Sequence, residues 1–308
     1  MRTGAIIVAA GAACGEDGFS PMKKLGTVSV IERIIMTFQQ AEADYIVVVT
    51  GAKAEALERC VARYNCICLR NPEYESTQML DSAKIGLRYL QNICDQFLLT
   101  PADAPLFTVR TVKMLKEAGL PAAIPLCGGQ EGHPIILSRE AVDHVLSYEK
   151  EGGIRGALDT WQDGITYLEV SDPGTLFDTD TPNGCEALLK HHNKQLLRPE
   201  LKVCLAREET FFDGRAQMLL KLIKQCGSVR MACSRLNLSY SKGWKLLNLL
   251  EAQLGFPVID RHPGGLNGGY TSLSARGEDF LSRYEELVCR SREAVEKIYG
   301  EVFGDLEE

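Results

Sequence analysis

The chain has 308 residues, about twice the usual domain size, with 45% hydrophobic and 24% charged residues and a formal net charge of −7. These values exclude disordered, collagen-like and fibrous proteins, and no apolar run approaches the roughly 20 residues that span a bilayer, so we expect no membrane segment and no secretion signal. The eleven cysteines lack C-x-x-C pairs, which favours reduced thiols in a cytoplasmic protein over disulfides or zinc.

Hydrophobic periodicity divides the chain into two domains. We predict one domain at residues 1–192, a polar linker at 193–210 and a second domain at 211–308. His191 and His192 are expected on the surface beside the linker. Residues 1–194 carry the whole net charge of −7, whereas residues 211–276 carry nine basic and three acidic side chains. This contrast suggests that the two domains bind partners of different character.

The first domain alternates short apolar runs with helix-periodic segments. Strands are predicted at residues 4–10, 45–50, 66–69, 96–100, 122–125, 135–137 and 167–170, and helices at 30–40 and 53–64. Such β-then-α alternation predicts an α/β fold, a three-layer, Rossmann-like arrangement with a mostly parallel sheet between helices. A sheet of this kind binds its ligands beyond the carboxyl ends of its strands.

The second domain has a different order of elements. Helices are predicted at residues 214–225, 228–236 and 240–254, followed by short strands at 256–261 and 269–273 and a long helix at 274–303. The two short strands flank a glycine-rich turn. Three helices, a glycine-rich hairpin and a terminal helix form the order of a winged helix-turn-helix with a long C-terminal helix.

Three segments of the first domain carry the residue types that nucleotide chemistry needs. Ala9, Ala10 and Gly11 end the first strand, and small side chains there let backbone N–H groups approach a phosphate. Asp103 follows another strand in P-A-D-A-P, and Asp180 lies in a second acidic segment, D-T-D-T-P. Carboxylates beside phosphates are suited to Mg²⁺, which neutralises charge when a nucleotidyl group is transferred.

Six motifs, in order over about residues 4–190, resemble the MobA-like nucleotidyltransferases: A-A-G, N-P-x-Y with S-A-x-x-G-L, P-A-D-A-P-L, G-H-P-I-I-L, E-G-G-I-R-G and D-x-D-T-P. The branch most similar to this sequence is the molybdenum cofactor cytidylyltransferase type, which joins CTP, or GTP in the guanylyl branch, to molybdopterin. The resemblance implies that the nucleotide is held by Ala9, Ala10, Gly11 and Ser82, Mg²⁺ by Asp103 and Asp180, and the pterin side by His133 and Arg155.

The glycine loop departs from that family. Its usual sequence is A-A-G-x-S-x-R-M-G-x-x-K-P-L, and an ungapped alignment places Gly15 at the arginine and Ser20 at the lysine. Lys23 or Lys24 is expected to replace the lost phosphate-binding charge as a catalytic cation, because a lysine is a flexible point charge. The alternative is a transcriptional regulator whose catalytically inactive transferase fold senses nucleotide or molybdenum cofactor.

The second domain contains S-Y-S-K-G-W-K-L-L and, further on, F-P-V-I-D-R-H-P-G-G-L-N-G-G-Y. These two segments resemble the DNA-binding part of the molybdate-responsive, ModE-type regulators, a LysR-like winged-helix family. The resemblance implies binding of double-stranded DNA by a homodimer paired through the long helix. The expected DNA contacts are Ser239, Ser241, Lys242, Lys245, Arg261 and His262. A third reading remains open, in which this domain binds a protein or only pairs subunits.

Overall fold

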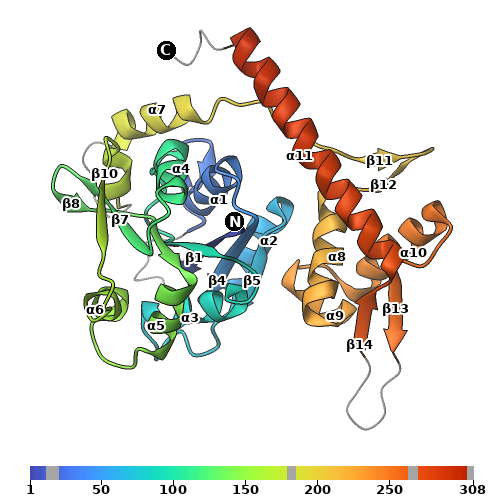
Figure 1. The fold of residues 1–308 in the computed structure, drawn as a ribbon, viewed down its shortest axis with the longest axis horizontal. Helices are drawn as coiled ribbons and strands as arrows, with labels where there is room; N and C mark the ends of the chain where they lie inside the picture. Colours follow the sequence, from blue (N-terminus) through green and yellow to red (C-terminus); the bar gives the residue numbers. More distant parts are fainter. Residues whose placement is uncertain (12–20, 179–184, 263–269, 304–308) are drawn as a thin grey trace. The chain divides into compact units, whose positions relative to one another are not determined.

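The computed structural model describes residues 1–11, 21–178, 185–262 and 270–303, and it divides into two compact units, Met1–Leu196 and Leu197–Glu308 (Figure 1). The predicted linker at 193–210 begins inside helix α7 (Cys185–Gln195) and ends inside a small hairpin of β11 (Leu205–Ala206) and β12 (Thr210–Phe212). Every helix in these ranges is too short or too polar to cross a membrane.

Unit 1 is built on an eight-stranded sheet in the order β10-β7-β9-β6-β1-β4-β5, with β8 paired to β7. The strands are β1 (Thr3–Ala9), β4 (Tyr45–Thr50), β5 (Ile67–Arg70), β6 (Gln96–Pro101), β7 (Ala122–Cys127), β8 (Gln130–Glu131), β9 (Ile135–Ser138) and β10 (Thr166–Glu169). Strands β6, β1, β4 and β5 are parallel, as is the pair β7 and β10. Strand β9 runs antiparallel to β6 and β7, so the sheet is mixed but mostly parallel, and the predicted α/β class is confirmed.

Helices cover both faces of this sheet (Figure 1). Their bounds are α1 (Val30–Gln40), α2 (Ala54–Val61), α3 (Met79–Leu90), α4 (Val109–Glu117), α5 (Arg139–Ser147) and α6 (Gly153–Asp159). Helices α1, α2 and α4 pack on one face, and α3 and α5 pack on the other. Short elements complete the unit: β2 (Lys24–Leu25), β3 (Val28–Ser29) and the 3-10 turns η1 (Ala62–Tyr64) and η2 (Pro173–Leu176).

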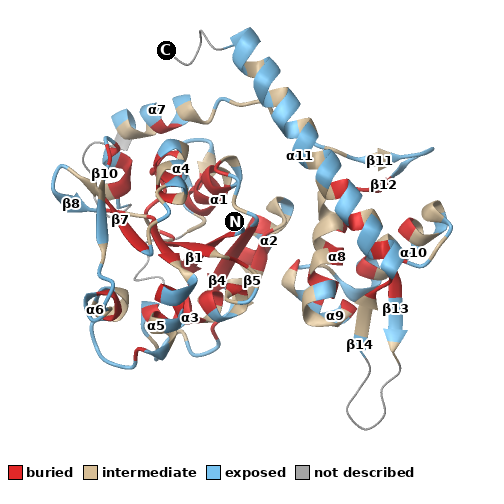
Figure 2. Cartoon of the chain, in the orientation of Figure 1, coloured by how far each residue is buried: buried red, intermediate tan, exposed pale blue. Residues whose placement is uncertain are grey.

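Strand β1 lies in the middle of the sheet and is buried along its whole length (Figure 2). Ala5 and Ile7 point toward the cluster that contains α1 and α4. Ile6 meets α3 on the other face, where a Cβ at Gly86 would lie 2.6 Å from Ile6 Cγ2. Gly86 therefore lets α3 approach β1 closely, which gives a packing reason for the glycine of S-A-x-x-G-L.

Unit 2 contains the predicted elements in the predicted order. They are α8 (Gly214–Cys226), α9 (Val229–Arg235), α10 (Tyr240–Leu254), β13 (Ile259–His262), β14 (Tyr270–Leu273) and α11 (Ala275–Phe303). Helices α9 and α10 touch closely, because a Cβ at Gly243 would lie 2.2 Å from Cys233 Sγ. Phe212 of β12 is fully buried and packs edge-on against Phe280 and Tyr284 of α11. The base of α11 thus belongs to the core of this unit.

His192 contradicts its expected surface position, since it is only 1% exposed. It lies on α7 and donates a hydrogen bond from Nδ1 to the carbonyl of Leu106 at 3.2 Å. Burial, together with the positive charge of Arg33, lowers the pKa of His192 to about 4. Arg33 itself donates to Asn193 Oδ1 at 2.7 Å, so one buried and one part-buried polar contact hold α7 in place within unit 1.

The low pKa of His192 predicts loss of stability in acid. The imidazole has an ordinary pKa of about 6.5 once unfolded, so its stabilising effect is complete above that value and declines as the pH falls toward the folded pKa near 4. Lowering the pH from 7.5 to 5.0 should therefore cost about 2 kcal/mol through this residue. The measurement is urea unfolding of a Trp244→Phe protein, in which Trp161 reports on unit 1. His192→Asn should remove this part of the pH dependence, and His191→Asn should not; equal curves for both would contradict the assignment.

Candidate functional site

A cleft of about 220 Å³ lies at the edge of the unit 1 sheet where β1, β4 and β6 end. The parallel register pairs Ala9 with Thr50 and Val8 with Pro101, so the loops after these three strands leave the sheet side by side. The cleft is lined by Val8, Ala9, Ala10, Gly11, Pro21, Met22, Ala52, Lys53, Leu57, Tyr74, Thr77, Gln78, Met79, Ser82, Pro101, Ala102 and Asp103.

Five of the predicted site residues lie together in this cleft. Ala9, Ala10 and Gly11 form its wall after β1, Ser82 enters from α3, and Asp103 enters from the loop after β6. They share one edge because the carboxyl ends of parallel strands share one edge. Their proposed contacts with nucleotide and metal remain predictions.

The N-P-x-Y motif has a structural role beside the cleft. Asn71 is 4% exposed and donates from Nδ2 to Thr77 Oγ1 and to Ser82 Oγ, both at 2.9 Å. Its backbone N–H donates to Thr50 O at 2.8 Å, and its Oδ1 accepts from Glu73 N at 3.0 Å. Asn71 therefore fixes Thr77 and Ser82 in the cleft wall, and the accepting Ser82 hydroxyl keeps a proton that it can donate to a ligand.

The predicted catalytic lysines do not line the described cleft. Lys23 lies in the turn before β2 and Lys24 lies on β2, and both side chains are exposed. The neighbouring Pro21 and Met22 do reach the cleft. The basic residue that the structure places in the described cleft wall is Lys53, which follows β4 and is not among the predicted site residues.

His133 lies near the same sheet edge, because β9 is antiparallel and begins where β6 ends; Leu99 pairs with Ile135. Its pKa is lowered mainly by burial, against an opposing effect of Asp178, so the imidazole is neutral at pH 7. Nδ1 is buried without a hydrogen-bond partner among the described residues. His133 does not line the described cleft.

Arg155 lies elsewhere, at the edge formed by β8, α6 and β10. Its guanidinium forms an ion pair with Glu131, a 2.9 Å bond to Asp159 Oδ1 and a 2.8 Å bond to the hydroxyl of Tyr167. Glu131, and to a smaller extent Tyr167, raise the pKa of Arg155. The structure thus does not bring Arg155 into the described cleft with Ser82 and Asp103.

The remaining acidic prediction, Asp180, lies outside the described residues, as do Gly15 and Ser20 of the glycine loop. Within the described ranges, no group of three His, Cys, Asp or Glu side chains is arranged to hold a metal ion. Mg²⁺ needs only one or two protein carboxylates when a substrate's phosphate oxygens and waters fill its other positions. The carboxylate of Asp103 in an otherwise largely uncharged cleft fits a cation bound in this way.

In unit 2 the predicted DNA contacts lie on two elements. Ser239 caps α10 by accepting from Lys242 N at 3.3 Å, and Ser241, Lys242 and Lys245 are exposed in the first turns of that helix. The other two predicted contacts lie on β13, where Arg261 is exposed and His262 is partly buried. The tip of this hairpin, residues 263–269, lies outside the described ranges.

Arginine and aromatic side chains connect these elements. The guanidinium of Arg261 lies over the ring of Trp244 at 4.2 Å, and that of Arg230 lies over Tyr240 at 5.0 Å. Tyr240 and Trp244 meet edge-on at 6.0 Å. These contacts run from α9 through α10 to β13, and Trp244 holds Arg261 against the first turns of α10.

Comparison with known proteins separates the two parts of the chain. Residues 5–165 match the MobA-like NTP transferase domain. The molybdenum cofactor cytidylyltransferase of Escherichia coli is 29% identical over 143 residues, which cover 45% of this chain and 70% of that protein. A nucleotidyl transferase structure from Methanothermobacter superposes with a TM-score of 0.53 at 19% identity, covering 63% of this chain and 98% of that one, and it supports the fold alone.

A second group of relatives consists of molybdenum-linked regulators. The transcriptional regulator ModE of Haemophilus influenzae is 35% identical over 81 residues, which cover 26% of this chain. The chain spans about a third of the length of that regulator, 32%. The chain therefore joins a transferase domain to a segment similar to molybdate regulators, as the motifs predict.

Proposed function

The chain belongs to the MobA-like NTP transferase family, and from that premise we propose that unit 1 transfers a nucleotidyl group from CTP or GTP to molybdopterin. In this reaction a phosphate oxygen of molybdopterin attacks the α-phosphorus of the nucleotide. A new P–O–P bond forms, the bond between the α- and β-phosphates breaks, and pyrophosphate leaves. The convergence of Ala9, Ala10, Gly11, Ser82 and Asp103 in one cleft carries this proposal.

The cleft residues have distinct tasks in the proposed reaction. The small side chains of Ala10 and Gly11 let the loop backbone approach the nucleotide, and Ser82 donates a hydrogen bond to it. Asp103, with Asp180, holds Mg²⁺, which when bound neutralises charge on the phosphates. We assign His133 and Arg155 to the part of the site that binds molybdopterin. There Arg155 must break its exposed ion pair with Glu131 in order to bind a phosphate.

Pyrophosphate release tests the proposal directly. The full chain is incubated with Mg²⁺, molybdopterin and each of the four nucleoside triphosphates in turn. The proposal requires release of pyrophosphate and formation of a dinucleotide cofactor with CTP or GTP, and it fails if no triphosphate is turned over. A cytoplasmic location belongs to this proposal, because the nine cysteines whose side chains the structure describes are free thiols, the state that a reducing compartment maintains.

For unit 2 we propose a winged helix-turn-helix that binds double-stranded DNA. Helices α9 and α10 would form the helix-turn-helix, with the start of α10 in the major groove and the β13–β14 hairpin as the wing. The exposed positions of Lys242, Lys245 and Arg261 and the similarity to ModE support this assignment. Loss of affinity with rising salt is the expected signature.

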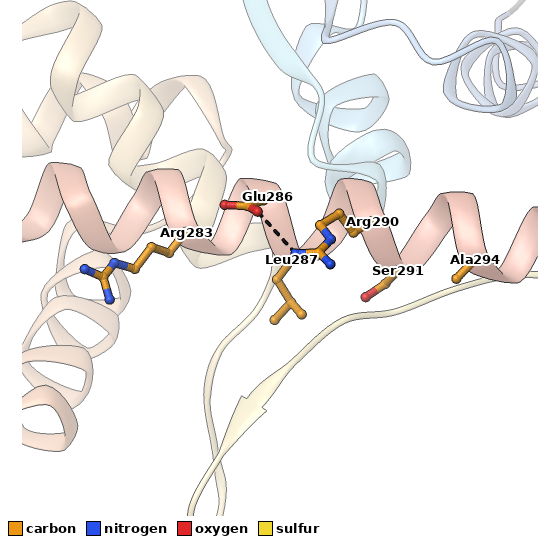
Figure 3. A pocket seen from close by; sticks show the side chains of 6 residues that line it. All are labelled: Arg283, Glu286, Leu287, Arg290, Ser291 and Ala294. Atoms are coloured by element: carbon orange, nitrogen blue, oxygen red, sulfur yellow. Dashed lines mark hydrogen bonds and ion pairs between the residues drawn. The ribbon is translucent and has the colours of Figure 1, made fainter.

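Helix α11 supports a homodimer as part of the same proposal. Beyond the core of unit 2 it exposes an apolar stripe: Leu287 is 42% exposed, Ile298 57% and Val302 60%. Figure 3 shows Leu287, Ser291 and Ala294 along this face. Apolar residues at three- and four-residue spacing are typical of helices that pair with another helix.

Replacing Leu287 and Ile298 by aspartate should convert the dimer to a monomer. Two charges in a helix pair must be desolvated without partners, which costs several kcal/mol and exceeds the stability of a modest interface. Light scattering after size exclusion gives the mass. Glu296→Lys, on the opposite side of α11, is the control and should leave the dimer intact. A dimer that persists in the double variant would refute the role of α11.

Two observations favour a second candidate function for unit 1. Gly15 and Ser20 replace the family's loop cations, and Lys23 and Lys24 do not line the described cleft. In this alternative the fold binds nucleotide or molybdenum cofactor without turnover and regulates DNA binding by unit 2. Tight ligand binding without pyrophosphate release, coupled to a change in DNA affinity, would support the sensor.

DNA binding that is absent or insensitive to salt would favour a different role for unit 2, in which it binds a protein or only pairs subunits.

A further inference from the structure

The charges of the described cleft lie at two separate places. Asp103 follows β6 and Lys53 follows β4, and β1 lies between these strands in the sheet. Among the described residues that line the cleft, Asp103 is the acidic residue and Lys53 is the basic residue; the others are apolar or neutral. A ligand that reaches both must have a part that binds a cation and a part that is itself anionic.

The backbone fixes Lys53 at the cleft. Gly51 packs so tightly that a Cβ there would lie 2.3 Å from Ala10 O and 2.7 Å from the side chain of Tyr74. Ala52 N donates to the same Ala10 carbonyl at 3.4 Å. The segment that follows β4 is therefore held against the end of β1, the strand whose loop is predicted to contact the nucleotide.

Lys53 also has an uncommon backbone conformation. It is the N-cap residue of α2 with φ 52° and ψ 31°, a left-handed conformation that glycine, asparagine and aspartate adopt more easily than lysine. Residues held in such conformations concentrate at functional sites. The lysine at this position therefore has a backbone conformation that its residue type does not favour, at the wall of the cleft.

The ammonium group of Lys53 is available for a ligand. Its side chain is exposed, and within the described ranges it forms no ion pair or side-chain hydrogen bond. Two other lysines of unit 1 differ in this respect: Lys84 donates to Tyr148 O, and Lys116 donates to Glu42 O at 3.2 Å. An ammonium without a partner at a cleft wall can bind an anion without first breaking an internal contact.

We propose that Lys53 binds the phosphate chain of the nucleoside triphosphate, an assignment that rests on the proposed function of unit 1. The ammonium offers three donors on a flexible stem, which suits a chain of phosphates that changes shape during the reaction. It supplies positive charge from the loop after β4, whereas the loop after β1 carries Gly15 and Ser20 at the positions of the usual cations. Lys53 is in this way a specific contact that the motifs do not predict.

The test is isothermal titration of the full chain with CMP, CTP, GMP and GTP in the presence of Mg²⁺. Lys53→Asn removes the charge and places a residue that tolerates the left-handed backbone, and Lys53→Met tests the same loss with an apolar side chain. Both should weaken CTP or GTP binding about 10-fold or more while changing monophosphate binding much less, because charge-assisted hydrogen bonds to phosphate are strong. Lys53→Arg should restore most of the affinity.

The control is Lys113→Met, which removes an exposed lysine of α4 away from the cleft and should bind as the wild type does. Thermal unfolding of each variant verifies the fold. Wild-type triphosphate affinity in both charge-removing variants would overturn the assignment and leave the proposed function intact. An equal loss for mono- and triphosphates would overturn it as well, by placing Lys53 at the base or ribose. A wild-type protein that binds no triphosphate would refute the proposed function together with this inference.

Discussion

Replacing Asp103 by asparagine is expected to lower the rate of pyrophosphate release by about 100- to 1,000-fold, the usual effect of losing one electrostatic contact in a transition state. The substitution removes one negative charge with almost no change in volume. Asp103 is the acidic residue of the described cleft wall, and the proposed cation and phosphates depend on its carboxylate. The rate is measured with saturating CTP or GTP, molybdopterin and Mg²⁺.

Two comparisons make this experiment specific. Asp163→Asn changes an exposed carboxylate in the turn before β10 and should leave the rate unchanged. Raising the Mg²⁺ concentration should recover part of the activity of the Asp103 variant, because a weakened metal site is filled by mass action. An Asp103→Asn protein with the wild-type rate would show that the cation and phosphates are bound without this carboxylate.

Removing three cations from unit 2 should have the second large effect. The combined variant Lys242→Ala, Lys245→Ala and Arg261→Ala is expected to lower the affinity for a 30-base-pair duplex about 100-fold or more at low salt. Each lost phosphate contact should also reduce the slope of log affinity against log salt by about one. Fluorescence anisotropy at several salt concentrations gives both quantities.

Trp244 permits a finer version of this experiment. Its ring lies under the guanidinium of Arg261 at 4.2 Å, so Trp244→Leu should weaken DNA binding by releasing Arg261, and Trp244→Phe should retain more of the affinity. Lys202→Ala removes an exposed lysine of the same unit, 79% exposed, and should behave as the wild type. An unchanged salt slope in the triple variant would show that DNA, if bound at all, contacts another surface.

The elements that could be predicted have strong local signals. The bounds of α1 agree with the prediction because Ile31, Ile34, Ile35 and Phe38 repeat at helical spacing and Ser29 begins the helix with a capping box. Strand β4 is an uninterrupted apolar run and is buried along its whole length. Gly11 and Asp103 could be predicted to lie in one cleft because parallel strands bring their carboxyl ends to the same edge of a sheet.

Other features depend on tertiary contacts and could not be predicted. Helix α3 was not predicted because Ser82, Lys84 and Gly86, which are polar or flexible, occupy its buried side; the first is bonded to Asn71 and the second to Tyr148 O. The four residues of β9 contain no sequence signal for its antiparallel direction. The sequence predicts Lys53 in a helix, whereas it is the N-cap residue with a left-handed backbone, two residues after Gly51, which packs against Ala10 and Tyr74.

The cleft after β1, β4 and β6 is proposed to transfer a nucleotidyl group. The most direct test follows the α-phosphate of CTP or GTP, labelled with ³²P, in a reaction with the full chain, molybdopterin and Mg²⁺. With nucleotidyl transfer, the label moves into a molybdopterin dinucleotide and the released pyrophosphate is unlabelled. A label that stays in the intact triphosphate, even when that triphosphate is bound tightly, would contradict it.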